Sequence, residues 1–522
     1  MKKKHLIHQA IAYNARQQPN QVALQGANTG NQTQSLTYAE LQTAINQQVQ
    51  AWKTLCANKR TVMAVAVENH PAWVILDLAA LECQVPLVPL PFFFSSAQWL
   101  HAMQDAGTNV LVTDHPELFE PLLAGNITNV SQFTLAEKTL TQFEFNEKSA
   151  VNLPVGTAKI TYTSGTTGNP KGVCLSVDNM LNVAGAIAQA TKLSAKDVHL
   201  SVLPLATLLE NVAGVYASLL AGATCVLLPA STIGLSGATG LDIKKLLATL
   251  IQAQASTAIF TPELLHALVL CVEAGATPPS DLRFLAVGGA SVSPALLKRA
   301  QQLSIPVYEG YGLSECASVV ALNVPFINKI GSVGKVLPHV NVEFTNDHEI
   351  IVTGNAYLGY VGQQHPPQNS IATGDIGYLD EDDYLIISGR KKNIFITSFG
   401  RNVSPEWVER ELKISPYIAQ VALYGEARPW NVAVIVPRAN ATTAQIEHAV
   451  QTVNNSLPDY ARVTRWIVAN EPFTLNNQQL TSNGRNRRDI IWQYYQDNIN
   501  ALYEDTLKEE SHDYLPNLTP SH

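Results

Sequence analysis

Short runs of β-branched and other apolar residues alternate with stretches of helical periodicity, and this alternation limits the folds open to the chain. Buried strands are predicted at Thr61–Val67, Val110–Thr113, Ala223–Leu228, Thr257–Phe260 and Phe284–Val287. Helices are predicted between them at Trp73–Leu81, Ser96–Ala106, Asn179–Ala190 and Glu263–Glu273. Such alternation predicts an α/β fold in which mostly parallel sheets are covered by helices.

The pattern changes near residue 388, after which the elements become short. Further strands are predicted at Ile394–Thr397, Ile418–Tyr424 and Val432–Val436, with helices at Pro405–Lys413 and from Thr443; Val340–Phe344 and Glu349–Thr353 resemble two strands of a small antiparallel piece. We therefore expect a large multi-layer N-terminal domain (1–388), a hinge (389–392), a small mobile α+β domain (393–510) and a frayed tail (511–522).

Composition and charge narrow the classes of partner. The net charge of -8 offers no basic field for nucleic acid. The uncharged run Val212–Leu228 is interrupted by Gly214 and Gly222, so a buried helix that turns at Ala221-Gly222 into a strand is expected, and no membrane span. No apolar run of signal-peptide length follows the basic start, so a soluble, cytoplasmic protein is expected.

The cysteines carry no recognisable framework. Six of them are scattered without a CxxC pair and without a histidine at ligand spacing. Free thiols are therefore expected, and neither a zinc site nor a disulfide framework.

The strongest chemical signal is the segment Thr161–Val173, TYTSGTTGNPKGV. Its glycines allow a tight backbone whose N–H groups can surround phosphate oxygens, its hydroxyls can donate to the same oxygens, and Lys171 adds positive charge. It is not a Walker A loop, because Lys171 is followed by Gly172 and not by serine or threonine. Strand-like residues on both sides argue against a mere flexible linker.

This loop resembles the phosphate loop of the adenylate-forming (AMP-binding) superfamily, which includes acyl-CoA synthetases, peptide-synthetase adenylation domains and luciferases. Five further segments resemble that family's motifs in the same order: Leu203–Glu210, Gly288–Ala290, Tyr308–Glu315, Thr373–Asp375 and Gly389–Lys391. The C-terminal segment from Glu471 to Arg488 and the stretch GRNVSPEWVE (Gly400–Glu409) are most similar to the long-chain acyl-CoA synthetase branch.

The resemblance implies a role for each matching residue. The implied catalytic residues are Thr166, Lys171, Glu315 and Arg485. Thr166 and Lys171 would hold the triphosphate of ATP, and Glu315 would hold Mg²⁺. The implied nucleotide-binding positions are Ser164, Gly165, Thr167, Gly168, Gly289, Ala290, Tyr311, Gly312, Ser314, Asp375 and Arg390. Tyr311 would stack on adenine, Ser314 would contact the α-phosphate, and Asp375 would bind the ribose with Arg390 in support.

The family's two half-reactions use two domain orientations around an active site between the domains. The resemblance then implies a hinge at Lys391 and a thiol channel at Ser398 and Gly400, while Ser404 is expected to cap the helix that follows. Two positions depart from the pattern. Thr207 stands in the acyl pocket where histidine is common, and Arg485 stands where the family supplies a lysine for adenylation.

These motifs imply an ATP-dependent acid–thiol ligase that adenylates a carboxylic acid, most simply a fatty acid, releases pyrophosphate and transfers the acyl group to coenzyme A. One alternative is an enzyme that loads an acyl or amino acid onto the phosphopantetheine thiol of a carrier protein, although Leu205–Thr207 offers no acid for an α-amine. Another is a catalytically weak acyl- or nucleotide-binding protein, in which Arg485, Arg487 and Arg488 form only a basic surface patch.

Overall fold

Two units make up the computed structural model, which describes residues 6–27, 33–57, 61–145, 151–163, 170–236, 240–363, 369–481 and 484–510. The first unit comprises Met1–Thr373 and Gly377–Ile387, and the second comprises Gly374–Ile376 and Ser388–His522. Each is described by itself.

Two large sheets organise the first unit. The nine-stranded sheet has the order β18-β17-β16-β15-β14-β10-β11-β1-β2, and the eight-stranded sheet has the order β21-β9-β8-β4-β3-β5-β7-β6. The first consists of β1 (Val22–Ala27), β2 (Thr33–Thr37), β10 (Val198–Ser201), β11 (Thr224–Leu227), β14 (Thr257–Phe260), β15 (Phe284–Val287), β16 (Val307–Leu313), β17 (Ser318–Leu322) and β18 (Lys335–Val336). The second consists of β3 (Met63–Ala66), β4 (Leu87–Pro89), β5 (Val110–Thr113), β6 (Ile127–Leu135), β7 (Lys138–Phe145), β8 (Lys159–Thr163), β9 (Lys171–Leu175) and β21 (Gly359–Tyr360). The strands from β1 through β11, β10, β14 and β15 to β16 run parallel, as do β5, β3, β4 and β8.

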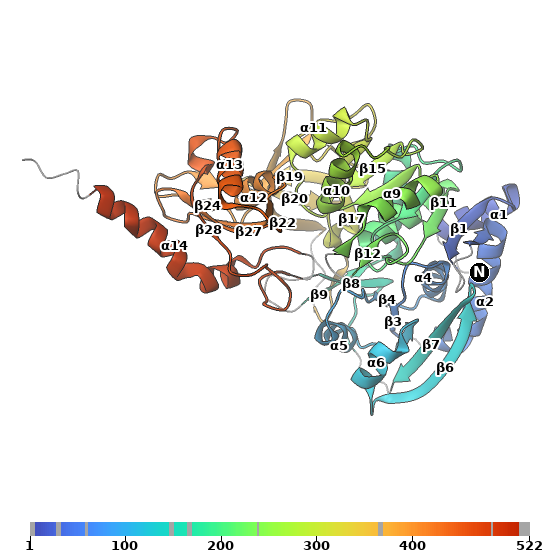
Figure 1. Cartoon of the computed structure of the whole chain (residues 1–522). Coiled ribbons are helices and arrows are strands. Elements are labelled where there is room, and N and C mark those ends of the chain that lie inside the picture. The colour runs from blue at the N-terminus through green and yellow to red at the C-terminus, as the bar shows by residue number, and fades with distance from the viewer. Residues whose placement is uncertain are drawn as a thin grey trace, which may run out of the picture. The chain divides into compact units, whose positions relative to one another are not determined.

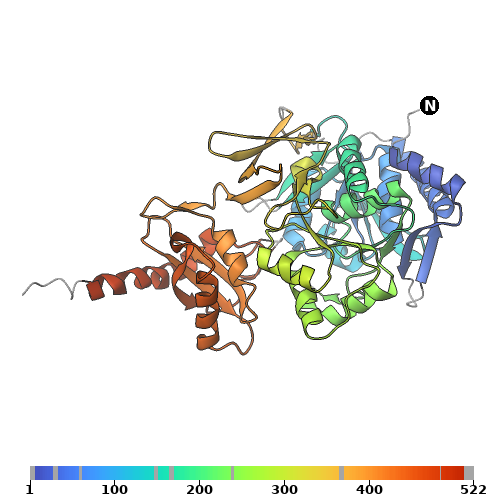
Figure 2. The same ribbon diagram turned by 90° about the horizontal axis from the view of Figure 1, so that it is seen from above.

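Helices fill the space between the sheets and cover their outer faces (Figures 1 and 2). The helices whose buried residues join the core between the sheets are α1 (Leu6–Gln17), α2 (Tyr38–Ala51), α4 (Pro71–Cys83), α7 (Val177–Ala190), the π-helix η1 (Leu209–Tyr216) and α8 (Ala217–Ala221). Those on the outer faces are α5 (Ser96–Asp105) and α6 (Pro116–Leu123) on one sheet and α9 (Ile243–Gln252), α10 (Pro262–Glu273) and α11 (Pro294–Gln302) on the other.

Strand alternation explains this layering. Along β3, Met63 and Val65 join the core between the sheets, whereas Ala64 and Ala66 join the core under α5 and α6. Both faces of the strand are buried, which is why its sequence is apolar throughout. The predicted multi-layer α/β fold is confirmed. Smaller elements complete the unit: α3 (Lys53–Ala57), the pair β12 (Leu235–Ser236) and β13 (Gly240–Leu241), and η2 (Ser314–Cys316). A further sheet has the order β19-β20-β22-β23 (Asn341–Phe344, Glu349–Thr353, Ser370–Leu379, Leu385–Arg390); of its residues, Gly374–Ile376 and Ser388–Arg390 are assigned to the second unit.

The uncharged run from Val212 is a buried helical segment, as predicted. The π-helix η1 continues into α8, which ends at Gly222 in the left-handed conformation (φ 78°), and β11 follows. The π-helical geometry was not predicted, because it has no periodic signature in the sequence. Among the described residues, no helix combines the length and apolar character needed to cross a bilayer.

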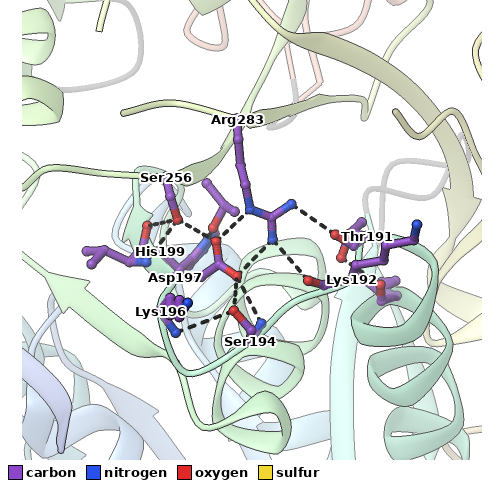
Figure 3. A network of polar contacts seen from close by, with 11 residues as sticks. Thr191, Lys192, Ser194, Lys196, Asp197, His199, Ser256 and Arg283 are labelled. Carbon is purple, nitrogen blue, oxygen red and sulfur yellow. Dashed lines mark hydrogen bonds and ion pairs between the residues drawn. The ribbon is translucent and has the colours of Figure 1, made fainter. Parts of the chain in front are cut away.

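Hydrogen bonds between polar residues connect the amino-terminal ends of three strands of the nine-stranded sheet (Figure 3). Asp197, which precedes β10, accepts hydrogen bonds from Arg283 Nε (2.6 Å) and Ser256 Oγ (2.8 Å), which precede β15 and β14. Burial opposes ionisation of Asp197, but the hydrogen bonds from Arg283 and Ser256 outweigh it and lower the pKa of this carboxyl. The cluster therefore holds the strand ends in register.

The second unit is a small α+β body. Its strands are β24 (Phe395–Ile396), β25 (Asn402–Val403), β26 (Ile418–Tyr424), β27 (Asn431–Pro437) and β28 (Val463–Val468), and its helices are α12 (Pro405–Leu412), α13 (Thr443–Asn454), η3 (Asp459–Ala461) and α14 (Arg488–Glu510). Ser404 occupies the N-cap position of α12, but its side chain makes no cap hydrogen bond. The expected cap is wrong in this respect: the Ser404 hydroxyl lies 3.4 Å from Glu406 Oε2 instead.

One expectation about the cysteines is also wrong. Cys174, Cys225, Cys271 and Cys316 are free, but Cys83 is disulfide-bonded. Cys83 is the last residue of α4, and the spacing of the cysteines along the sequence does not indicate that it forms a disulfide.

A buried ion pair lies in the layer between the two sheets. Lys159 Nζ is 2.8 Å from Asp77 Oδ1, and neither side chain is exposed to solvent. Asp77 lies on α4 and Lys159 begins β8, while Tyr216 of η1 donates from its hydroxyl to Asp77 Oδ2 at 2.7 Å. Asn211, also of η1, donates to the same oxygen at 3.0 Å and contacts the Lys159 ammonium. Three elements thus converge on one pair of charges.

We expect Asp77→Asn to lower the free energy of unfolding by roughly 3–5 kcal/mol at neutral pH, because it leaves a buried ammonium without its counter-ion. Burial lowers the pKa of Lys159, and Asp77 opposes that shift. Without Asp77 the folded state holds the proton less tightly than the unfolded state, so the deficit should shrink as pH rises toward about 10. Urea denaturation across pH checks this.

The control is the double variant Asp77→Leu/Lys159→Met, which removes both charges and should recover much of the loss. A small, pH-independent effect of Asp77→Asn would contradict the role assigned to the pair.

Candidate functional site

The carboxyl ends of the parallel strands of the nine-stranded sheet bring several of the predicted residues together. Gly289 and Tyr311 each lie two residues beyond the paired residues Val287 and Glu309 of β15 and β16. Ligand sites in parallel α/β sheets form beyond this edge. Gly289 and Ala290 are exposed there, and Ser314 follows β16 in the short helix η2.

Two of the predicted glycines are required for different backbone reasons. Gly312 lies at an irregularity of the β16–β17 pairing, and a Cβ on it would fall 1.6 Å from the carbonyl oxygen of Ser318. Gly289 has φ +84° and open space around it, so its requirement is the left-handed conformation. The backbone at the carboxyl ends of β15 and β16 therefore requires glycine at both positions.

A chain of side chains links Lys171 to Glu315 within the first unit. The Tyr360 hydroxyl donates to Glu315 Oε1 at 2.9 Å, and Lys171 Nζ lies 5.4 Å from the centre of the Tyr360 ring. Burial, followed by the negative charge of Glu315, raises the pKa of Tyr360 well above its usual value, so the hydroxyl stays protonated. Tyr357 supports the arrangement: its backbone N–H donates to the Glu315 carbonyl at 2.8 Å, and its ring meets that of Tyr360 edge-on.

The sequence did not point to Tyr360. It belongs to β21, which pairs with β9 so that Tyr360 lies opposite Val173, close to Lys171 along the strand. Glu315 follows a strand of the other large sheet. The Tyr360–Glu315 hydrogen bond therefore connects the two sheets.

The predicted phosphate loop joins β8 to β9, and Thr163 at the end of β8 is the partner of Lys171 at the start of β9 in the antiparallel pairing. Five predicted positions in the loop lie outside the described residues: Ser164, Gly165, Thr166, Thr167 and Gly168. Their roles remain predictions.

Thr207 lies half-buried in a turn, where its hydroxyl donates to the Pro204 carbonyl at 2.8 Å. Glu210 holds the start of this segment, since its Oε2 accepts from the Leu203 N–H at 2.9 Å while its Oε1 lies 2.7 Å from His199 Nε2. Asn69, which follows β3 of the other large sheet, donates to the Leu203 carbonyl and accepts from the Leu205 N–H. Asn69 was missed, because nothing near it in the sequence connects it with this turn.

In the second unit, Asp375 and Arg390 form an ion pair with 3.1 Å between Asp375 Oδ1 and Arg390 Nε. Gly374 (φ +71°) precedes the acid, and its carbonyl accepts from the N–H of Lys391 at 2.9 Å. The structure thus brings together the two residues predicted for the ribose and places the predicted hinge residue beside them.

Ser398 and Gly400 lie in the exposed loop of the β24–β25 hairpin. Gly400 has φ +72°, and the N–H of Ser398 donates to the Arg428 carbonyl at 3.0 Å. The loop therefore has a defined backbone and presents the side chain of Phe399, which is 76% exposed.

Arg485 is exposed in a turn tied by Thr481, whose N–H donates to the Arg485 carbonyl at 2.8 Å. Burial, then the positive charges of Arg390 and Arg485, lower the pKa of Lys392, although Asp489 opposes them. These cations share one region of the second unit. Arg488 differs: its side chain is only 15% exposed and pairs with Glu409 through contacts of 2.6 and 2.7 Å, so the surface-patch interpretation is wrong for it.

Two family models match the chain. The model for the AMP-binding enzyme covers residues 11–360, and the model for the AMP-binding enzyme C-terminal domain covers residues 392–507. The chain belongs to the AMP-binding enzyme family.

Curated relatives of this family member include a long-chain-fatty-acid–CoA ligase, FadD15, of Mycobacterium bovis. It is 26% identical, with 83% of this chain and 86% of the relative covered. A 2-succinylbenzoate–CoA ligase of Bacillus pumilus is also 26% identical, with coverage of 76% and 81%. Among solved structures, the o-succinylbenzoate CoA synthetase of Bacillus subtilis with its acyl-adenylate intermediate has a TM-score of 0.72 at 22% identity, covering 92% of this chain and 97% of that one. It shows that the fold is shared.

We expect Gly312→Ala to destabilise the first unit severely, because the added carbon meets a backbone oxygen that cannot move aside. Gly289→Ala is the matched control, with open space and only the left-handed strain of about 1–2 kcal/mol. Urea denaturation of both variants checks this. Equal losses would contradict the distinction between steric contact and backbone conformation.

Proposed function

We propose that this protein joins a carboxylic acid to a thiol in two steps driven by ATP. In the first, a carboxylate oxygen attacks the α-phosphorus of ATP and pyrophosphate leaves, which gives an acyl-adenylate. In the second, the thiol sulfur of coenzyme A attacks the acyl carbon, the thiol loses its proton, and AMP leaves. The observation that carries the proposal is the Lys171–Tyr360–Glu315 chain, which begins where the phosphate-type loop ends.

This chain suits a polyphosphate and its cation. Lys171 supplies positive charge for phosphate oxygens, and Thr166 with Ser164, Thr167 and the loop glycines supplies donors in the proposal. Tyr360 occupies Glu315 Oε1, which leaves Oε2 for Mg²⁺, a cation that prefers carboxylate oxygen. When bound, Mg²⁺ neutralises charge on the phosphates. The structure of the Bacillus subtilis synthetase with ATP and a magnesium ion supports this choice of cation.

In the proposal, the remaining predicted residues bind the adenine, the α-phosphate and the ribose of the nucleotide. Tyr311, with the backbone of Gly289 and Ala290, receives adenine at the sheet edge, and Gly312 lets Ser314 approach the α-phosphate. Asp375 accepts hydrogen bonds from the ribose hydroxyls, and its ion pair with Arg390 orients the carboxylate.

We infer a fatty acid as the substrate and coenzyme A as the acceptor. The named activity of the Mycobacterium bovis relative supports both. The turn around Thr207 supports the first, because Leu205–Thr207 offers no carboxylate to pair with an α-amine.

Pyrophosphate release should require ATP, Mg²⁺ and a carboxylic acid together. Across a panel of fatty acids, 2-succinylbenzoate and amino acids, we expect the fatty acids to be turned over fastest, with an acyl-CoA product when coenzyme A is present. Release of orthophosphate would refute the mechanism, whereas a preference for 2-succinylbenzoate or an amino acid would refute only the substrate assignment.

Tyr360→Phe should slow adenylation by about 10–100-fold, because it removes one hydrogen bond to a charged group, which is typically worth about 1.5–3 kcal/mol. The ring beneath Lys171 stays. Tyr384→Phe is the matched control, since Tyr384 also lies beneath lysines, Lys329 and Lys335, but outside the proposed site. If the two variants turn over equally fast, Tyr360 does not position Glu315 for the reaction.

Arg485→Ala should slow adenylation by about 10²-fold or more, because its guanidinium is proposed to stabilise charge on the transferred nucleotide. Thiolysis of a supplied acyl-adenylate should continue, and Arg485→Lys should retain activity. Arg487→Ala, two positions further along the chain, is the control and should leave the rate of adenylation unchanged. If the natural protein shows no adenylation activity and Arg485→Lys gains it, the natural protein is instead a catalytically weak acyl- or nucleotide-binding protein.

A further inference from the structure

Three potential metal ligands meet beyond the carboxyl ends of two neighbouring parallel strands of the eight-stranded sheet. Ala66 of β3 is the register partner of Thr113 of β5, and Glu68, Asp114 and His115 follow these strands. One ligand atom from each lies within 4.8 Å of the others. The elements β3 and α6, which flank the cluster, lie in the lower part of Figure 1.

Asp114 carries the observation that points to a cation. Its side chain is only 1% exposed, and its Oδ2 accepts from the Glu68 N–H at 3.3 Å and pairs with Lys138 Nζ at 2.9 Å. Its Oδ1 is buried without a hydrogen-bond partner. Lys138 balances charge at the other oxygen of this carboxylate, but a buried Oδ1 without a partner of its own is still costly, and a cation would satisfy it.

His115 is held in an orientation suited to a metal. Its Nδ1 lies 2.9 Å from Glu117 Oε1, and the ring of Phe92 meets the imidazole edge-on, with 5.1 Å between the ring centres. A carboxylate on one ring nitrogen is the usual partner of a metal-ligating histidine. A metal ion bound by this histidine would then use Nε2, because Nδ1 contacts Glu117.

We propose that Glu68, Asp114 and His115 form a binding site for a divalent first-row transition ion such as Zn²⁺. One imidazole with two carboxylates is a ligand set of that class. The two carboxylates and Lys138 together leave one negative charge to favour a cation. The site uses none of the residues proposed for Mg²⁺.

An ion at this position would stabilise the ends of the two strands that the cluster follows. It would join the ends of β3 and β5, and Glu68 immediately precedes Asn69, which holds the turn between Leu203 and Thr207. An ion at this site would therefore stiffen the segment that supports the proposed acyl-binding turn.

The test uses the full chain, treated with a chelator and then titrated with Co²⁺ in the absence of nucleotide. Binding is followed by visible absorption, and Zn²⁺ is added in competition. We expect one equivalent to bind saturably, His115→Ala and Glu68→Gln to weaken binding at least about tenfold, and Glu117→Gln to weaken it about 10–100-fold. Lys138→Met should tighten binding, because it removes a competing cation.

Glu120→Gln, an exposed acid on the same helix as Glu117, is the control and should bind as the natural protein does. Circular dichroism verifies the fold of each variant. If Glu68→Gln does not fold, His115→Ala is the decisive variant, because His115 is half-exposed and its replacement disturbs the fold less. The proposal is overturned if the natural protein binds no stoichiometric ion, or if His115→Ala binds it with undiminished affinity.

Discussion

The ion pair between Lys159 and Asp77 is the interaction on which the rest of the first unit depends. It is fully buried, and it joins the central helix α4 to β8 and, through Tyr216, to the π-helix η1. The far end of β8 leads into the phosphate-type loop, and η1 begins two residues after Thr207. A buried charge tolerates little displacement from its partner, so the pair sets where both functional segments begin.

In the nine-stranded sheet, the amino ends of the parallel strands carry structural contacts, whereas the carboxyl ends carry residues of the proposed nucleotide site. At the amino ends, Asp197 and Arg283 hold short parallel strands in register. At the carboxyl ends, the chain leaves β15 toward Gly289, while Gly312 lies next to Tyr311 within β16. Because Glu315 belongs to this edge and Tyr360 to the other large sheet, the proposed polyphosphate site depends on both sheets keeping their places.

Much of the fold could be predicted because the signals are local. Strands such as Thr257–Phe260 are apolar on both faces, and helices such as Val177–Ala190 carry both apolar periodicity and a capping serine at Ser176. The Asp375–Arg390 pair also followed from motifs. Tyr360 and Asn69 could not be predicted, because each contacts residues brought near only by folding. Arg488 was misjudged for the same reason: its partner Glu409 lies on another helix.

Oxygen transfer tests the proposed reaction most directly. The protein would be supplied with ATP, Mg²⁺, coenzyme A and a fatty acid whose carboxylate carries ¹⁸O, and the products would be analysed by mass spectrometry. Attack of the carboxylate on the α-phosphorus predicts that one labelled oxygen appears in AMP and none in pyrophosphate. Label in orthophosphate alongside ADP, or AMP without label, would contradict the account.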